Sequence, residues 1–294
     1  MKNAYVITGP TSGIGRHTAL ELAKHGTLIL VGRDRDKLEA LKKEIGDAIP
    51  VVCDVSDLAS VRRAAREIIA LGLPIAGIVN NAGIMPFRPA KSAQGIDSAF
   101  ATNHLGPFAF TEALIPHLPD GAHVVFVCSA VEDPERKPAR IAGFRGARYI
   151  SAEASARGEW APGGAKSPGY DAYATSKQGN LVTVMEFARE YPRLRFNAVE
   201  PGFSPATSLG RDANVLLRLL GKYVLSLIAP FIKYWSTPQR AGRVITDVLI
   251  KSNGTGDYYD EKGVPMKGSV QSRDPAFQDR VVAETRAFLA TVEA

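Results

Sequence analysis

The chain is poor in cysteine, with only Cys53 and Cys128 among its 294 residues. Both lie in apolar runs of strand character, at 49–53 and 124–128. Two thiols placed in this way predict buried, reduced side chains rather than a disulfide framework, and hence a reducing compartment.

The sequence also lacks an uncharged apolar stretch long enough to cross a bilayer. Its first predicted strand begins almost at Met1, which leaves no space for the charged and apolar regions of a signal peptide. We therefore expect a cytoplasmic protein without a transmembrane segment.

Blocks of like charge are missing as well. Lys and Arg outnumber Asp and Glu by 36 to 30, a net charge of +6 that is spread along the chain. This surplus is compatible with an anionic cofactor or an anionic membrane surface but requires neither. No nucleic-acid-binding signature is present, and no metal site is predicted.

What the sequence does contain is a regular alternation of apolar strand-length runs with segments of helical period. Strands are predicted at 4–8, 27–31, 51–54, 76–80, 123–128 and 195–200, and helices at 14–25, 34–45, 57–71, 95–118 and 170–191. The uninterrupted Val, Ile and Leu runs indicate strands covered on both faces. The order predicts one α/β domain over 1–294, a Rossmann-type doubly wound parallel sheet with helices on both faces.

Two stretches interrupt this order. Residues 131–169 are rich in Gly, Pro, Arg and Ser without periodicity, which is typical of a functional or a disordered loop. Residues 209–236 are unusually apolar. They are read as part of a substrate lid at about 203–236, with a core helix, a subunit interface in a homo-oligomer and a peripheral membrane contact as alternatives.

A glycine-rich segment joins the first predicted strand to the first predicted helix. Glycines here let the backbone turn sharply and approach a pyrophosphate, which the free N–H groups of the helix start then bind. The residues expected to contact this dinucleotide are Gly9, Thr11, Ser12, Gly13, Ile14 and Gly15.

The end of the second predicted strand indicates which dinucleotide is bound. Gly32 occupies the place where NAD sites carry an acid, and Arg33 can pair with the 2′-phosphate of NADP(H). Asp34 either serves a ribose hydroxyl or caps the next helix. The sequence favours NADP(H) over NAD(H).

Polar residues follow two further strands at the same carboxyl edge of the sheet. Asp54 either accepts a hydrogen bond from the adenine amino group or forms a turn, and Val55 follows it. The second group is Asn81, Ala82 and Gly83. All five are expected to border the cofactor.

Tyr173 and Lys177 stand four residues apart on a predicted helix, hence on one face. A neighbouring ammonium lowers the pKa of a phenol and makes it a better proton donor and acceptor. Ser129 follows the fifth strand and can hydrogen-bond a substrate carbonyl oxygen. Asn103 is a poor helix former inside a predicted helix, which indicates a site role or a local kink.

In this order the motifs resemble the short-chain dehydrogenase/reductase family: Thr8-Gly-x-x-x-Gly-x-Gly15, Asn80-Asn-Ala-Gly83, Asn103, Ser129, Tyr173-x-x-x-Lys177 and Pro201-Gly202. The resemblance covers about residues 3–260. It implies Tyr173 as general acid/base, Lys177 as its activator and ribose ligand, and Ser129 as carbonyl stabiliser. It also implies a water held by Asn103 and passage of Pro201-Gly202 beside the nicotinamide carboxamide.

The long Ser129-to-Tyr173 interval resembles the retinol dehydrogenase and protochlorophyllide reductase-like branch, whose members handle bulky apolar substrates. The chain departs from the family where a Thr usually follows Pro-Gly closely; Thr207 is the nearest candidate. The sequence thus predicts an NADP(H)-dependent enzyme that interconverts a carbonyl and an alcohol on a hydrophobic substrate. The rival interpretation is a catalytically idle NADP-binding sensor or interaction protein.

Overall fold

The computed structural model describes residues 2–86, 88–203 and 234–293, and within them eight strands form one sheet. The strands lie in the order β3-β2-β1-β4-β5-β6-β7-β8, and every neighbouring pair is parallel except β7 and β8. Their bounds are β1 (Ala4–Thr8), β2 (Thr27–Gly32), β3 (Ala48–Val52), β4 (Ile75–Asn80), β5 (His123–Val127), β6 (Arg195–Val199), β7 (Asp257–Tyr259) and β8 (Pro265–Met266). The strand order reverses between β1 and β4, and ligands of such sheets bind at the carboxyl edge beside this point.

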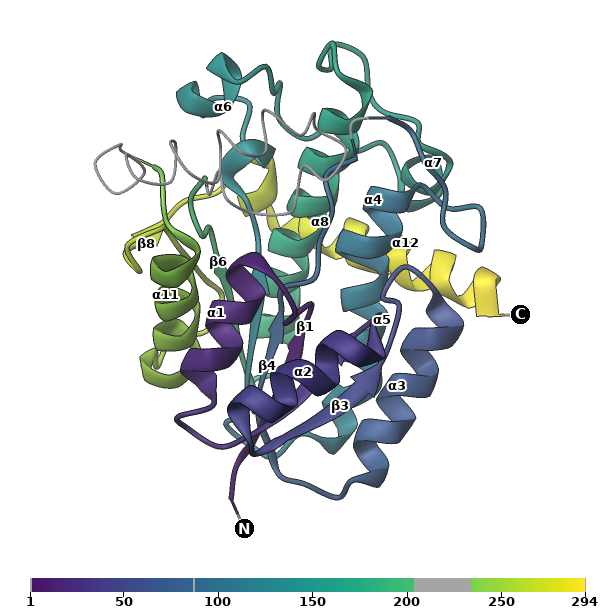
Figure 1. Cartoon of the computed structure of the whole chain (residues 1–294). Helices are drawn as coiled ribbons and strands as arrows, with labels where there is room; N and C mark the ends of the chain where they lie inside the picture. The colour runs from purple at the N-terminus through teal and green to yellow at the C-terminus, as the bar shows by residue number, and fades with distance from the viewer. Residues whose placement is uncertain (1, 87, 204–233, 294) are drawn as a thin grey trace.

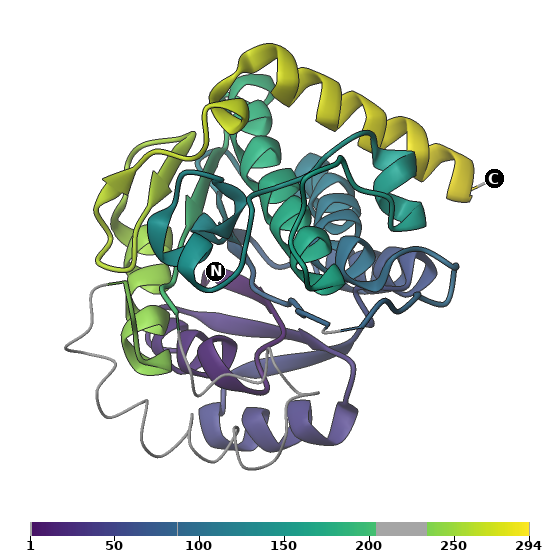
Figure 2. The same ribbon diagram turned by 90° about the horizontal axis from the view of Figure 1, so that it is seen from above.

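Helices cover both faces of this sheet (Figures 1 and 2). One face carries α1 (Gly13–Leu22), α2 (Arg35–Ile45) and α11 (Pro238–Lys251). The other carries α3 (Leu58–Ala70), α5 (Gly106–Leu114) and α8 (Pro168–Glu190), with α12 (Pro275–Glu293) packed on α8. The predicted doubly wound α/β sheet is confirmed.

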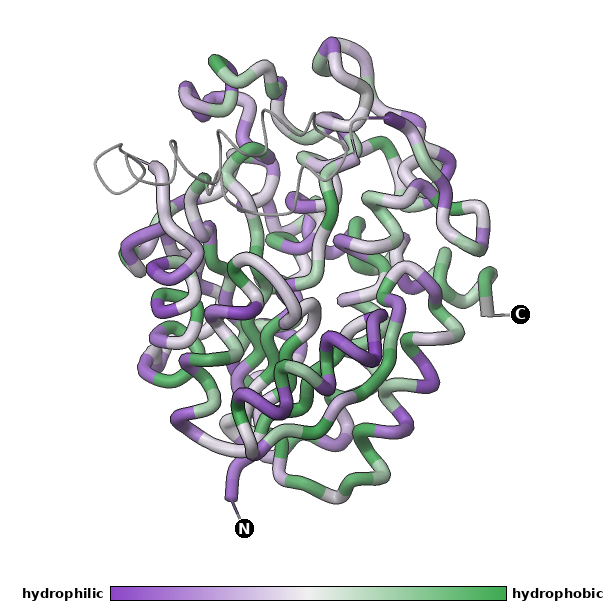
Figure 3. The backbone as a smooth tube through the Cα atoms, viewed as in Figure 1, coloured by the Kyte–Doolittle hydropathy of each residue, from purple (hydrophilic) through white to green (hydrophobic). Residues whose placement is uncertain are grey.

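The strands are apolar throughout because both faces are covered. In β1, Ala4 and Val6 belong to one apolar cluster, whereas Tyr5 and Ile7 belong to the cluster on the opposite face. Figure 3 shows the hydrophobic colour running along these central strands. Successive side chains therefore alternate between the two faces of the sheet, although the sequence shows no alternation because both sets are apolar.

Two helix starts follow the predicted capping chemistry. The Asp34 carboxylate accepts a hydrogen bond from Lys37 N at 3.1 Å, and that of Asp57 accepts one from Ala59 N at 3.0 Å. The predicted end of the first helix is wrong, because α1 stops at Leu22. The following Gly26 does not end the helix directly; it is required because a Cβ there would lie 2.2 Å from the carbonyl oxygen of Asn3.

The third strand and the long central helix also differ from prediction. β3 begins earlier and ends at Val52, and it tolerates Pro50 because it is the edge strand of the sheet. The helix predicted over 95–118 is divided into α4 (Ser98–Phe100), the π-helical turn η1 (Ala101–Leu105), α5 and the 3-10 turn η2 (Ile115–His117).

The segment 131–169, for which the composition left a functional and a disordered loop open, contains regular structure. It contains the end of the 3-10 turn η3 (Ala130–Glu132), the helices α6 (Lys137–Ile141) and α7 (Ala152–Arg157), and the first residues of α8. The buried Glu132 anchors it, since its carboxylate accepts hydrogen bonds from Ser269 N at 2.8 Å and Ser272 Oγ at 2.7 Å.

The elements after β6 were not anticipated: α11, β7, β8, the 3-10 turn η7 (Gln271–Arg273) and α12. Most of the apolar stretch 209–236, and Thr207, lie outside the described residues, so only Phe203 and residues 234–236 of the expected lid are seen. Among the described helices, none is both long and apolar enough for a bilayer span.

Candidate active site

The glycine loop between β1 and α1 has a conformation that only glycine accepts easily. Gly9 and Gly13 have φ of +66° and +53°. A Cβ on Gly15 would lie 2.2 Å from the Gly9 carbonyl oxygen, so α1 can start this close to the loop only without a side chain there. The cradle in front of the α1 N-terminus therefore fits the pyrophosphate of a dinucleotide.

Asn81 supports this loop from the end of β4. Its Nδ2 donates hydrogen bonds to the carbonyl oxygens of Thr8 at 2.9 Å and Gly9 at 3.2 Å. The side chain of this predicted cofactor residue thus braces the loop. Gly83 follows, and a Cβ there would lie 3.3 Å from Asn103 Oδ1 and 3.6 Å from Lys177 Nζ. The segment 81–83 therefore connects the cradle to the predicted proton-transfer residues.

At the far end of the cradle, Arg33 and Asp54 face each other. Arg33 Nη1 lies 3.7 Å from Asp54 Oδ2, and 56% of the Arg33 side chain is exposed. Asp54 Oδ1 accepts hydrogen bonds from Ser56 N and Ser56 Oγ, which is the turn-forming geometry. Asp34 is bonded to the backbone and ammonium of Lys37, so its carboxylate serves as a helix cap.

Tyr173, Ser129 and Lys177 come together at the carboxyl edge of the sheet. Tyr173 and Ser129 lie close enough for the Ser129 hydroxyl to lower the pKa of the phenol. Lys177 Nζ lies 5.7 Å from the centroid of the Tyr173 ring and donates to the Val127 carbonyl oxygen at 2.7 Å. A phenol, a hydroxyl and a buried ammonium from three parts of the sequence thus form one cluster.

Burial controls the electrostatics of this cluster. It raises the pKa of Tyr173, and the charge of Glu200 raises it further, while the Ser129 hydroxyl lowers it. Burial lowers the pKa of Lys177, because an ammonium loses its hydration there, and the nearby Cys128 and Glu200 oppose this shift. An added positive charge in this site would therefore favour the phenolate strongly.

Asn103 lies in the π-helical turn η1 and is fully buried. Its side-chain amide makes three hydrogen bonds: Oδ1 accepts from Ile84 N at 2.8 Å, and Nδ2 donates to Ile84 O at 2.9 Å and Ser176 Oγ at 3.0 Å. The predicted kink is present. The amide ties the segment after β4 to α8, beside Tyr173.

A model of the family described as "short chain dehydrogenase" matches residues 3–137. A short-chain dehydrogenase/reductase of Armillaria gallica is 29% identical over 283 residues, covering 90% of this chain and 85% of the relative. The matched region holds the glycine loop, the Asn80–Gly83 segment, Asn103 and Ser129. Over this region the chain resembles the short-chain dehydrogenase/reductase family.

The expected branch resemblance within the short-chain dehydrogenases/reductases is also confirmed. Retinol dehydrogenase 13 of Mus musculus is 28% identical over 275 residues, covering 87% of this chain and 74% of the relative. An uncharacterised protein of Mycobacterium paratuberculosis has a similar crystal structure, with a TM-score of 0.72, 27% identity and coverage of 98% and 93%. Members of this family are oxidoreductases that bind a nicotinamide cofactor.

Sequence reasoning missed Glu200 as a residue of this site. It follows β6, and its carboxylate accepts a hydrogen bond from Ala130 N, next to Ser129. Next in the chain, Pro201 is buried and Gly202 has φ +78°, with a Cβ there 2.9 Å from Glu261 Cβ. The sequence carried one signal for Glu200. It is a charged residue at the carboxyl end of a predicted strand, and that strand lies next to the strand that precedes Ser129.

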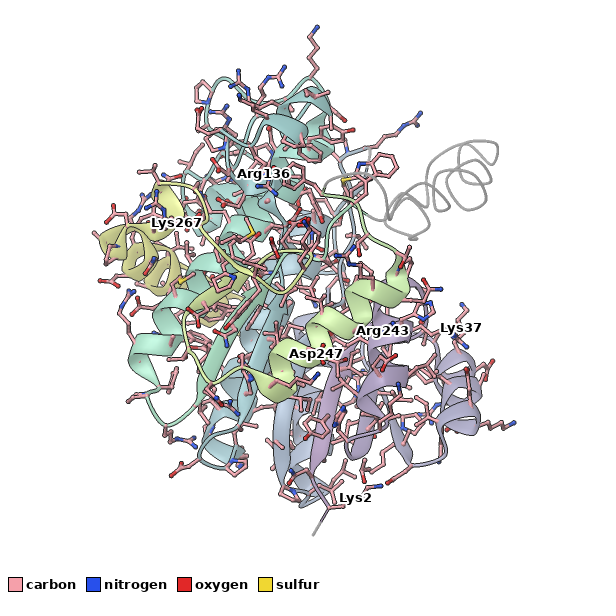
Figure 4. All side chains as sticks on the ribbon, turned by 90° about the vertical axis from the view of Figure 1, so that its left-hand side faces the viewer. Lys2, Lys37, Arg136, Arg243, Asp247 and Lys267 are labelled. Carbon is pink, nitrogen blue, oxygen red and sulfur yellow. The ribbon has the colours of Figure 1, made fainter. Side chains whose placement is uncertain are left out.

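Apolar and aromatic side chains surround the Tyr173 ring, packed with Ala139, Phe144, Met85, Val131 and Tyr170. The Phe144 and Tyr170 rings stack with centroids 4.1 Å apart. The guanidinium of Arg136 lies 4.3 Å from the centroid of the Tyr234 ring, and Figure 4 shows Arg136 at the end of the molecule opposite Lys2. The ordered 131–169 segment therefore borders the site.

Proposed function

We propose that this protein is an NADP(H)-dependent reductase/dehydrogenase that interconverts a carbonyl and an alcohol on a hydrophobic substrate. The observation that carries the proposal is the buried cluster in which Lys177 Nζ lies 5.7 Å from the centroid of the Tyr173 ring, with Ser129 close enough to lower the pKa of the phenol. Reduced nicotinamide would supply a hydride to the carbonyl carbon and be oxidised in doing so. The electron pair of the C=O π bond moves to the oxygen, which then accepts a proton.

That proton comes from the Tyr173 hydroxyl. Ser129 donates a hydrogen bond to the same carbonyl oxygen and stabilises the charge that develops there. Lys177 stabilises the phenolate left on Tyr173 until a proton from water restores it. Asn103 acts as a positioning residue, because its amide holds Ile84 and Ser176 through three hydrogen bonds.

Two observations support NADP(H) over NAD(H). Gly32 has no carboxylate to accept from a ribose hydroxyl, and Asp34 is engaged as the cap of α2. Within the described residues, Arg33 forms an exposed ion pair with Asp54. Exposed ion pairs are weak, about 0–1 kcal/mol, so its guanidinium can turn to a 2′-phosphate. We assign contacts with this cofactor to Gly9, Thr11, Ser12, Gly13, Ile14, Gly15, Arg33, Asp54, Val55, Asn81, Ala82, Gly83, Tyr173, Lys177, Pro201 and Gly202.

The apolar wall around Tyr173 supports a lipophilic substrate, since Met85, Val131 and Phe144 offer it no hydrogen-bonding side chain. The whole described chain acts as one catalytic domain in this proposal. The free, buried thiols of Cys53 and Cys128 suit a reducing compartment, which supports the cytoplasm.

The test is the oxidation of NADPH by a panel of aldehydes and ketones of increasing apolar size. We expect turnover that improves with apolar size, and a loss of roughly 10²–10⁴-fold in kcat/KM for Tyr173→Phe in a protein that still binds NADPH. Tyr191→Phe, at the far end of the same helix, is the matched control. NADPH binding without turnover of any carbonyl would instead support the cofactor-sensing or interaction protein.

A further inference from the structure

Glu200 and Ser129 are neighbours because β5 and β6 run in parallel register. Val127 pairs with Val199, and Cys128 N donates to Val199 O at 2.8 Å. The two chain segments leave the sheet side by side at its carboxyl edge. The charged end of Glu200 therefore reaches the backbone on the far side of Ser129, at Ala130 N.

The position of this carboxylate is tightly defined. Its own backbone N–H donates to Tyr259 O at 2.8 Å on β7, and its side chain accepts a hydrogen bond from Ala130 N. Ser129 lowers the pKa of the Glu200 carboxyl and that of the Tyr173 phenol, so its hydroxyl lies near both groups.

Several ionisable groups surround Glu200, Ser129 and Tyr173. Lys177 on α8 is the cation closest to the phenol, and the buried Cys128 thiol precedes Ser129. Arg136, in the segment 131–169, lies near Glu200. The other two ionisable groups are the buried Tyr258 of β7 and Glu132. Among these groups Glu200 is the carboxylate that acts on both Tyr173 and Lys177: it opposes a phenolate and favours an ammonium.

Building on the proposed function, we propose that Glu200 is a positioning residue of this site: it orients the Ser129 hydroxyl and, through its negative charge, keeps the proton on Tyr173, so that carbonyl reduction is favoured over alcohol oxidation near neutral pH. Reduction requires a protonated Tyr173 as the acid, whereas oxidation requires the phenolate as the base. A fixed carboxylate beside the phenol stabilises the first form relative to the second.

The sign of the expected pH effect follows from the order of ionisation. Burial raises the pKa of Glu200, yet a carboxyl still loses its proton well before a phenol does. Glu200 is therefore charged throughout the alkaline range in which Tyr173 ionises. Removing its charge lowers the pKa of Tyr173, and at a fixed pH below that pKa the phenolate fraction rises about tenfold when the pKa falls by about one.

The decisive experiment follows tyrosine ionisation in the cofactor-free protein by NMR of ¹³Cζ-labelled tyrosine, with Tyr173 assigned through Tyr173→Phe. In Glu200→Gln, an isosteric change that retains an acceptor for Ala130 N, we expect Tyr173 to ionise about one pH unit or more below its wild-type midpoint. Glu132→Gln is the matched control, because Glu132 is also buried near Ser129 but is bonded to Ser269 and Ser272. It should leave the Tyr173 titration unchanged.

Activity gives a second readout. In Glu200→Gln, carbonyl reduction should decline at a lower pH than in wild type, and the ratio of oxidation to reduction kcat near neutrality should rise about tenfold. Should Glu200→Gln not fold, Glu200→Ala serves for the same titration. An unchanged Tyr173 midpoint, or an equal shift in Glu132→Gln, overturns the inference whatever the activity. A lowered midpoint in a protein that reduces no carbonyl supports the charge effect and overturns the proposed function alone.

Discussion

At the scale of single residues, the two ends of the candidate site use charge in opposite ways. Arg33 and Asp54 at the nucleotide end are largely exposed, so their 3.7 Å contact is screened by solvent and easily rearranged. Lys177 and Tyr173 are buried, and the pKa of each departs from its ordinary value. In the proposed function, selectivity for the 2′-phosphate would therefore rest on an exposed cation, and proton transfer on fixed buried groups.

Arg33 is expected to discriminate between the two dinucleotides. Arg33→Ala should weaken NADPH binding by about 10–100-fold and leave NADH binding nearly unchanged, because only NADP carries the 2′-phosphate that the guanidinium pairs with. Dissociation constants for both dinucleotides, measured by fluorescence titration, test this. Arg35→Ala, an exposed arginine at the start of α2, is the control. Equal losses for NADPH and NADH would contradict the assignment.

At the scale of elements, the π-helical turn η1 places Asn103 between two parts of the site. A regular α-helix through 101–105 would rotate Asn103 away from the Ile84 backbone. The π-helical turn therefore allows the three hydrogen bonds of the Asn103 amide. The same turn lies against the main chain after β3, since a Cβ on Gly106 would lie 1.9 Å from Val55 O.

Loss of the Asn103 amide should destabilise this arrangement. Asn103→Ala leaves Ile84 N and Ile84 O without partners and should lower the free energy of unfolding by about 2–4 kcal/mol. Urea denaturation measures the change. Gln94→Ala, which removes an exposed hydrogen bond to Asp57, is the control and should cost less than about 1 kcal/mol. If both variants lowered the free energy of unfolding equally, the hydrogen bonds of the Asn103 amide would not be stabilising this arrangement.

The junction of the glycine loop with α1 should not tolerate a methyl group. Gly15→Ala places a Cβ 2.2 Å from Gly9 O and 2.4 Å from Asn81 Nδ2, so loop and helix must separate. We expect NADPH affinity to fall at least about 100-fold. Gly72→Ala, at a glycine of positive φ with open space around it, should cost about 1 kcal/mol of stability and leave NADPH binding intact. Calorimetric titration distinguishes these outcomes.

At the scale of the whole molecule, buried histidines link stability to pH. Burial lowers the pKa of both His104 and His123 from 6.5 to about 4. As the pH falls from about 6.5 towards 4, the unfolded chain binds protons that the folded protein does not, so stability is present above this range and is lost through it.

His104 should account for a large part of that loss, on the order of 3 kcal/mol once the pH has fallen to its folded-state pKa. Urea denaturation at a series of pH values should show a smaller acid-dependent loss in His104→Asn than in wild type. His117→Asn, at an exposed position, is the control. Identical pH slopes in wild type and His104→Asn would contradict this origin of the acid sensitivity.

Local chemistry explains why much of the fold was predictable. The capped start of α2 at Asp34, the strand runs of β1 and β2 and the glycine loop depend on residues close together in sequence. The errors and open alternatives arose where distant parts of the chain decide. Gly26 is required by the backbone of Asn3, Pro50 is tolerated only because β3 is an edge strand, and the 131–169 segment is anchored through Glu132 to residues 269–272.

The order of residues along the chain was enough to predict the doubly wound sheet, the cradle and the pairing of Tyr173 with Lys177, because these depend on local patterns within or just after a strand or helix. Ser129 could be added to the pair because it follows a strand whose carboxyl end lies at the same edge of the sheet. The bracing roles of Asn81 and Asn103, and the presence of Glu200 in the site, emerge only once the chain is folded. The physical reason is that a hydrogen bond or charge interaction depends on distance in space, and the pairing of β5 with β6 brings together residues 129 and 200, which are far apart in the chain.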